Sequence, residues 1–144
     1  MNVDAILRVK GDAVVIIAPA ATIADAIELL REKRIGAVVV TSDGKAPQGI
    51  LSERDIVRGL GAHGAALLTR RVEEIMTRAV VTCGPHDRVA DLMALMTERR
   101  IRHLPVMRNG VLAGLVSIGD VVKNRLDEIE LETSSLKTYI AGAA

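Results

Sequence analysis

Aromatic residues are almost missing from this sequence, which has one tyrosine and neither phenylalanine nor tryptophan. Single-stranded nucleic acid is usually bound by stacking bases on aromatic side chains, so the chain lacks the platform for such a site. Its formal net charge is only +1, which gives no broad attraction to nucleic acid or to an anionic membrane. We therefore expect neither nucleic acid nor a membrane among its partners.

Cysteine is equally scarce, because Cys83 is the only one. A single thiol excludes an internal disulfide and an all-cysteine metal site, and a buried position at a strand end suits it better than nucleophilic catalysis. No apolar run reaches the roughly 18 residues of a membrane span, and the first residues lack the features of a signal peptide. The sequence therefore predicts a cytoplasmic protein.

Patterns of catalytic residues are absent as well. The sequence shows no nucleophile spaced with a base and an orienting group, and no phosphate loop with its lysine. His63 and His86 have no partners at metal-ligand spacing, so no metal site is expected. The sequence favours a protein that is not an enzyme and requires no cofactor.

Aliphatic residues are abundant, and they recur in an order that occurs twice. Hydrophobic residues make up 49% of the 144 positions, enough for a sizeable core. An amphipathic segment at 3–9 comes first. The first copy then has expected strands at 13–18, 37–40 and 49–51 and helices at 23–33 and 53–60. The second has expected strands at 80–83, 103–107 and 111–116 and helices at 89–99 and from about 119 to near 131.

The two copies match at a nearly constant offset. Pro85 follows Pro19 by 66 residues, and Asp120 follows Asp55 by 65. Such a duplication indicates two related units. Because about 60 residues are few for an independent core, we expect repeats 8–62 and 76–131 to pack together in a single module, 1–144. The predicted fold is α+β, with pseudo-twofold symmetry and two related clefts between the repeats.

Each copy contains the pattern Gly-x-x-Ser-x-x-Asp, at 49–55 and at 114–120. The serine stands where a helix N-cap is expected, and the aspartate falls in the first helical turn. Backbone N–H groups at such a helix start can bind an anion, while the carboxylate can accept hydrogen bonds from a ribose diol. The alternative is an ordinary capped helix with a favourable aspartate at its N-terminus. Duplication of the pattern favours the ligand site.

With these motifs, the chain resembles a tandem pair of CBS domains, the Bateman module, from about Leu7 to Leu131. The resemblance also rests on Arg100-Ile-Arg-His-Leu-Pro-Val106 and on Asn109-Gly-x-x-x-Gly114. It implies two β-α-β-β-α units packed through their sheets and commonly paired into a flat disk. It further implies clefts that take adenine nucleotides.

The resemblance assigns roles to individual residues. It implies that Asp55 and Asp120 hold riboses. It places phosphates near Ser52, Ser117, Arg102 and His103, with Arg54 as a further candidate. It places adenines against Val14, Val15, Ile16, Ile17, Val80, Val81, Thr82 and Cys83. The first repeat has Gly36 and Ala37 where the second has Arg102 and His103, so the two clefts should differ in phosphate binding.

These expectations describe a free-standing regulatory protein that binds AMP, or a related ligand such as ATP or NAD(H), and signals energy or redox state to a separate, unidentified effector protein. The sequence does not separate these ligands from S-adenosylmethionine. A homodimer is expected through apolar residues of the helices after each motif, namely Ile56, Val57, Leu60, Val121, Val122 and Leu126. The alternative is an interaction protein whose nucleotide pockets have decayed. The presence of both serines and both aspartates argues against such decay. An enzyme is the third choice.

Overall fold

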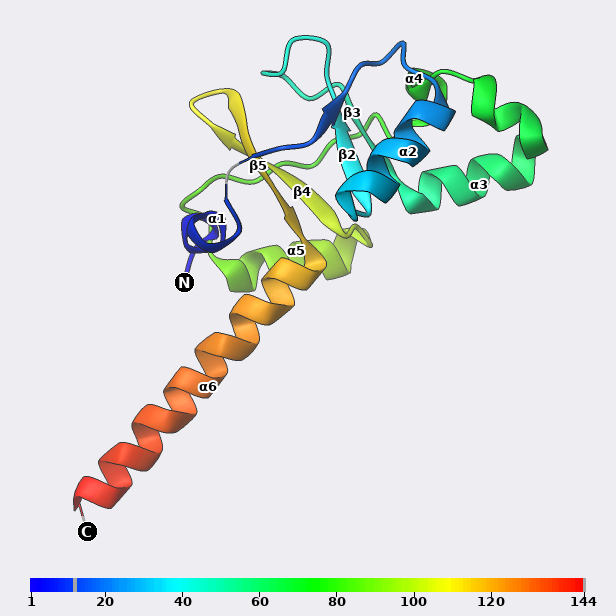
Figure 1. The fold of residues 1–144 in the computed structure, drawn as a ribbon. Coiled ribbons are helices and arrows are strands. Elements are labelled where there is room, and N and C mark those ends of the chain that lie inside the picture. Colours follow the sequence, from blue (N-terminus) through cyan, green and yellow to red (C-terminus); the bar gives the residue numbers. More distant parts are fainter. Residues whose placement is uncertain (12, 144) are drawn as a thin grey trace.

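Two small sheets, one in each repeat, form the centre of the computed structural model, which describes residues 1–11 and 13–143 (Figure 1). The first repeat has the sheet order β1-β2-β3, and the second has the hairpin β4-β5. The elements in chain order are α1 (Val3–Lys10), β1 (Ile16–Ile17), α2 (Ile23–Lys33), β2 (Ala37–Val40), β3 (Gly49–Ser52), α3 (Glu53–His63), the 3-10 helix η1 (Gly64–Thr69), α4 (Val72–Ile75), α5 (Val89–Arg99), β4 (His103–Arg108), β5 (Val111–Ser117) and α6 (Ile118–Ala143).

Helix boundaries follow the local signals in the sequence. Thr22 and Ser52 cap α2 and α3, and each makes a reciprocal capping box with the aspartate three residues later. Helices α2 and α5 both end in a left-handed residue, at Arg34 and Arg100. These ends lie 66 residues apart, as the duplication predicts.

The expected first strand of each repeat is much reduced. The strand predicted at 13–18 is formed only at Ile16–Ile17, which pairs in parallel with β2. The strand predicted at 80–83 is wrong, because only Cys83 bridges to Val106 of β4. Among the described residues each segment pairs with one strand, β2 or β4, so it lacks the second ladder that holds a central strand.

Helix α3 is longer than the helix predicted at 53–60. It continues to His63 and ends at Gly64, whose φ is 60°. Gly59 lies inside the helix, where a Cβ would come within 2.8 Å of Leu67 Cδ1. The glycine therefore allows η1 to pack closely on α3 instead of breaking the helix.

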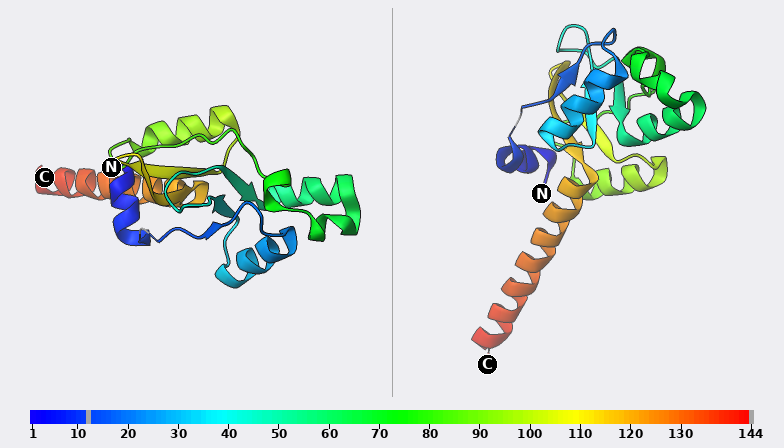
Figure 2. Two further views of the ribbon diagram at one scale, coloured as in Figure 1. Left: turned by 90° about the horizontal axis from the view of Figure 1, so that it is seen from above. Right: turned by 45° about the vertical axis from the view of Figure 1, so that its right-hand side comes forward.

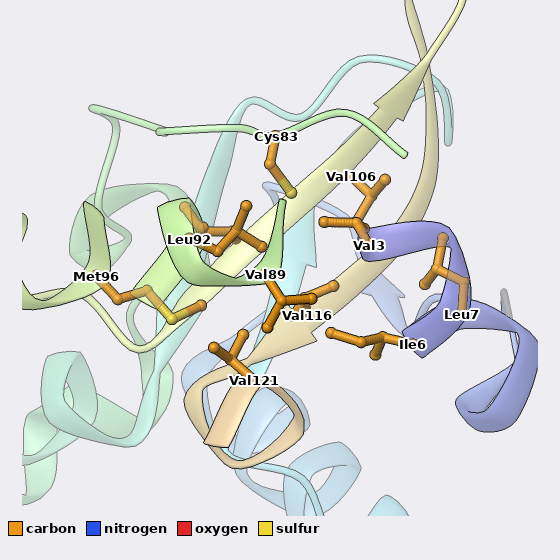
Figure 3. Close-up of a cluster of buried hydrophobic side chains, with 11 residues drawn as sticks. Val3, Ile6, Leu7, Cys83, Val89, Leu92, Met96, Val106, Val116 and Val121 are labelled. Atoms are coloured by element: carbon orange, nitrogen blue, oxygen red, sulfur yellow. The ribbon is translucent and has the colours of Figure 1, made fainter. Parts of the chain in front are cut away.

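Each repeat has its own buried aliphatic cluster. The first contains Ile17, Ile23, Ala26, Leu30, Val38, Val40, Leu51, Ile56, Leu67, Val72 and Met76. The second contains Val3, Ile6, Leu7, Cys83, Val89, Leu92, Met96, Leu104, Val106, Val116 and Val121 (Figure 3). Helix α1 therefore belongs to the core of the second repeat, although it precedes the first in sequence. Ile56 and Val121 lie inside these cores, so their predicted part in a dimer surface is wrong.

Helix α6 is the longest element, and its C-terminal half extends away from the rest of the molecule in all views (Figures 1 and 2). In the described part of the chain, no helix combines the length and apolar character needed to cross a membrane.

Candidate functional site

Two cavities are each lined by a serine of the duplicated motif, and the larger of these two, of about 280 Å³, lies at the start of α3. Three segments form its walls: the β3–α3 connection, residues 77–81, and the turn from α5 into β4. Its lining residues are Gly36, Ile50, Ser52, Glu53, Arg54, Asp55, Arg58, Thr77, Ala79, Val80, Val81, Arg100, Ile101, Arg102 and His103. Both repeats contribute, as the predicted packing requires.

The carboxylate of Asp55 is held in one orientation at this cavity. Its Oδ2 accepts hydrogen bonds from the Ser52 N–H at 2.9 Å and from Ser52 Oγ at 3.1 Å. Its Oδ1 accepts a hydrogen bond from Thr77 Oγ1 at 3.0 Å. Thr77 is itself fixed by two backbone hydrogen bonds with Ile50. The side chain of Asp55 is only partly buried, so the oriented carboxylate remains available to a ligand.

Thr77 was not among the predicted site residues. It lies in the connection between the repeats and has no counterpart in the duplicated motif, so spacing gave no signal for it. The pairing of its backbone with Ile50 is long-range and is visible only in the folded chain.

Positive charge dominates the walls of the larger cavity. Arg54 and Arg102 both line it, as does His103, so the structure brings these three predicted residues together. Arg58 and Arg100 line it too, and neither was predicted. Arg58 stands one helical turn after Arg54 on the same face of α3, a spacing that the sequence could have revealed. Four arginines against the carboxylates of Glu53 and Asp55 favour an anionic ligand.

The smaller cavity, of about 120 Å³, lies near the equivalent motif of the second repeat. It is lined by Lys10, Ala13, Val14, Val15, Ile35, Gly36, Ala37, His103, Leu115 and Ser117. The structure therefore places Ser117 at this cavity. Arg54 and Arg102 line the larger cavity instead, so the two cavities differ in their charged lining residues.

Asp120 already has a cationic partner within the chain. Its Oδ2 accepts hydrogen bonds from Lys10 Nζ at 2.7 Å and from the Ser117 N–H at 2.9 Å. Lys10 Nζ also donates to the Leu115 carbonyl at 2.8 Å. Burial alone would raise the pKa of Asp120, but these hydrogen bonds outweigh it and hold the pKa below its usual value. The lysine thus occupies an acceptor that the family resemblance assigns to a ribose.

His103 lies between the two cavities and lines both, as does Gly36. Burial lowers the pKa of His103, the charges of Lys10 and Arg102 lower it further, and Asp120 opposes them. The imidazole is therefore mainly neutral near pH 7 and acts as a hydrogen-bonding group there.

Of the eight residues predicted to frame adenine, four line a cavity and four do not. Val80 and Val81 line the larger cavity, and Val14 and Val15 line the smaller one. The other four, Ile16, Ile17, Thr82 and Cys83, line neither. Ile17 and Cys83 turn into the two hydrophobic cores instead. Burial, with the charge of Asp87 adding to it, raises the pKa of Cys83 to about 12, so its thiol is not ionised at neutral pH.

Comparison with known proteins identifies the family of this chain. The model of the CBS domain family matches residues 9–62 and 72–127. The CBS domain-containing protein CBSX3, mitochondrial, of Arabidopsis thaliana is 38% identical over 125 residues, a match that covers 84% of this chain and 61% of the plant protein.

Solved structures show the same likeness. A CBS-domain containing protein from Agrobacterium tumefaciens superimposes with a TM-score of 0.84 at 44% identity, over 87% of this chain and 99% of that one. A CBS domain pair crystallised with 5′-methylthioadenosine and S-adenosyl-L-methionine shares the fold, with a TM-score of 0.78 at 22% identity over 89% of this chain and 98% of that one. The present chain belongs to the CBS domain family and folds as a CBS-domain pair.

Proposed function

We propose that this chain is a regulatory module that binds an adenine nucleotide in its larger cavity. The observation that carries the proposal is the convergence of one oriented carboxylate, Asp55, with four arginines in a single cavity between the repeats. A nucleotide offers the two complementary groups, a ribose diol for the carboxylate and phosphate oxygens for the guanidinium groups. The adenosine ligands of the related CBS pair support this class of ligand.

Among adenine nucleotides, AMP suits the larger cavity best. The volume of about 280 Å³ lies near the lower end of the range for small-molecule pockets, which favours a mononucleotide over NAD(H). In this arrangement the ribose hydroxyls donate to Asp55, and Val80 and Val81 pack against the adenine. Arg54 and Arg102 bind the phosphate, with Ser52 at the start of α3 beside it. ATP is the next candidate, because the two further arginines can accommodate more negative charge.

The smaller cavity should prefer a less charged adenosine ligand. Lys10 is its single lysine or arginine among the described lining residues, and that lysine already pairs with Asp120. A ribose reaching Asp120 has to displace the ammonium group. We therefore expect weaker binding here than in the larger cavity, with Ser117 near any phosphate. The same contact is what a decayed pocket would show, so the alternative of an interaction protein applies most strongly to this cleft.

The proposed role is signalling and not catalysis. The walls of the larger cavity come from both repeats, so a bound nucleotide favours one relative packing of the repeats over others. A separate effector protein, in our proposal in the cytoplasm, reads that change.

We further propose a homodimer through the exposed apolar residues of α3 and α6. Val57 is 66% exposed and Leu126 is 57% exposed, and Leu60 and Val122 are exposed beside them. Exposed apolar residues such as these on a small module favour association.

Isothermal titration calorimetry with AMP, ATP, NADH and S-adenosylmethionine tests the proposed function directly. We expect the tightest binding for AMP or ATP, and loss of that binding in Asp55→Asn, which removes the charge while keeping the side-chain shape. Mass spectrometry of small molecules released from the purified protein provides an independent readout. The proposal is overturned if none of the four ligands binds at millimolar concentration.

A further inference from the structure

Helix α6 continues far beyond the part that packs on the module. It has 26 residues, which corresponds to a length of about 39 Å. Its first turns pack against α5 and α1, with Val121 fully buried. From Ile129 to Gly142 every residue is exposed. An isolated helix of that length is marginal in water unless an apolar face is covered, so this segment calls for a partner.

Apolar side chains follow one line along the exposed helix. They lie at alternating steps of four and three residues, the repeat of a coiled-coil seam. The seam consists of Val122, Leu126, Ile129, Thr133, Leu136 and Ile140. Leu126, Leu136 and Ile140 are 57%, 59% and 60% exposed. Five of the six positions are apolar, and Thr133 is the only polar one.

This seam is not the face that α6 presents to the module. The module side of the helix is marked by Val121, Asn124 and Glu128, which are buried or half-buried. At about 100° per residue, the seam lies roughly a third of a turn around the helix from these residues. It starts at Val122, whose counterpart 65 positions earlier is the exposed Val57 of α3. The seam therefore begins at the position equivalent to the exposed Val57 of the first repeat.

The charged residues beside the seam indicate which helix packs against it. In heptad notation, with Leu126, Thr133 and Ile140 at position a, position g holds Arg125 and then Glu132, and position e of the following heptads holds Glu130 and then Lys137. In a parallel, in-register pair of helices, each g residue faces the e residue five positions later on the partner. The two resulting pairs, Arg125 with Glu130 and Glu132 with Lys137, are both attractive.

We propose that residues 122–140 of α6 form a parallel, in-register, two-stranded coiled coil with the same segment of a second copy of this chain. Among the described residues, Glu130, Glu132 and Lys137 make no ion pair within their own chain, which leaves them free for the partner. Arg125 pairs with Glu128 of its own helix at 3.2 Å and would extend that pair to Glu130 across the seam.

The proposal rests on the homodimer proposed above and adds which helices meet and in which direction. Because α6 belongs to the second repeat, a parallel seam places the two second repeats side by side. Three heptads are short for a coiled coil, so contacts between the modules and contacts along the seam reinforce one another through their shared linkage.

Cysteine cross-linking tests the direction of the seam. Leu136→Cys places a thiol at a d position, where it meets its own counterpart only in a parallel, in-register pair. Leu131→Cys is the matched control, because Leu131 is 62% exposed on the opposite side of the same helix. Under mild oxidation we expect most of the Leu136→Cys chain as a disulfide-linked dimer, and little from Leu131→Cys or from the wild type, whose Cys83 is buried. Equal cross-linking of both variants, or none of Leu136→Cys, overturns the proposal.

A charge exchange tests the pairing itself by sedimentation equilibrium. Glu132→Lys should raise the dimer dissociation constant about tenfold, because two attractive pairs become repulsive. Adding Lys137→Glu should restore the wild-type value to within about twofold. In an antiparallel pair the g residues face each other, so the second substitution would not restore association, and that result contradicts the proposal, as does a monomeric wild type.

Nucleotide titration of the same variants separates the two proposals. If AMP binds as tightly as in the wild type while Leu136→Cys fails to cross-link, the seam is wrong and the nucleotide site stands. If the cross-link forms but no nucleotide binds, the seam stands and the proposed ligand is wrong.

Discussion

The two aspartates of the duplicated motif occupy equivalent positions but have different partners. Asp55 accepts hydrogen bonds from uncharged groups, Ser52 and Thr77, and faces a cavity with four arginines. Asp120 instead pairs with the ammonium group of Lys10. The same motif therefore presents a carboxylate bonded to uncharged groups in one cleft and a carboxylate paired with a cation in the other, and Thr77 and Lys10, which make this difference, lie outside the motif.

Arg102 should contribute to ligand affinity at the larger cavity and not at the smaller one. Its guanidinium lies at the larger cavity, so Arg102→Ala removes a charge-assisted contact there of about 1.5–3 kcal/mol, or roughly a ten- to hundredfold loss of affinity. Binding at the smaller cavity should change little. Titration calorimetry resolves the two phases, and Arg99→Ala, at the exposed end of α5, serves as the control. Equal weakening of both phases would contradict the asymmetric arrangement.

The Lys10–Asp120 pair should make stability depend on pH. The folded-state pKa of Asp120 is lowered, so the pair stabilises the protein above the unfolded pKa of about 3.9 and is lost as pH falls through the folded pKa. Lys10→Met keeps most of the aliphatic stem and removes the charge.

Urea unfolding from pH 3 to pH 7 measures the effect of this substitution. The variant should be less stable than the wild type at pH 7, by about 1 kcal/mol or less because the lysine is partly exposed, and the two should converge toward pH 3. A stability difference that stays constant over this range would show that the ion pair is not responsible.

At the scale of elements, α2, α3, α5, α6 and the two hairpins were predictable because caps, periodicity and turns are local, whereas the short helices η1 and α4 were not predicted. The capping boxes at Thr22 and Ser52 and the hairpin at Asn109 are encoded within a few residues. The edge segments near residues 14 and 81 were not predictable, since pairing at an edge depends on a distant strand. The same reason hid Thr77 and Lys10, whose site contacts span 22 and 110 residues.

Helix α3 begins next to a close contact that couples the connection between repeats to the site. A Cβ at Gly49 would lie 2.5 Å from Met76 Sδ and 2.9 Å from the Thr77 carbonyl. Gly49→Ala should therefore shift residues 76–77, destabilise the fold by about 1–3 kcal/mol and weaken AMP binding by displacing Thr77 from Asp55.

Gly61→Ala is the control, because a Cβ at Gly61, which lies within α3, has open space around it. It should be neutral or stabilising by up to about 1 kcal/mol and should leave binding unchanged. Thermal unfolding and calorimetry of both variants distinguish the effect of the close contact at Gly49 from the general effect of replacing glycine by alanine. A loss of stability in Gly49→Ala without any change in AMP affinity would show that this contact does not influence the site.

On the scale of the whole molecule, the two repeats have separate cores but together form the walls of the larger cavity. Each repeat buries its own cluster, and each is too small to be very stable alone. The larger cavity is built from Ser52 and Asp55 on one side and from Arg100 and Arg102 on the other. A ligand held by both sides is thus bound only when the repeats are folded and packed together.

Ligand binding should accordingly stabilise the entire chain as one cooperative unit. At a concentration of AMP 100 times its dissociation constant, the gain is about 2.7 kcal/mol, or roughly 5–10 °C in melting temperature for a chain of this size. Differential scanning calorimetry should show a single transition that moves as a whole. Asp55→Asn should abolish the shift while lowering the melting temperature of the free protein only slightly, since a carboxylate in the first turn of a helix contributes about 0.3–1 kcal/mol. If AMP instead splits the transition, so that only one repeat gains stability, the nucleotide does not bridge the repeats, and relative repacking of the repeats cannot be the signal that an effector reads.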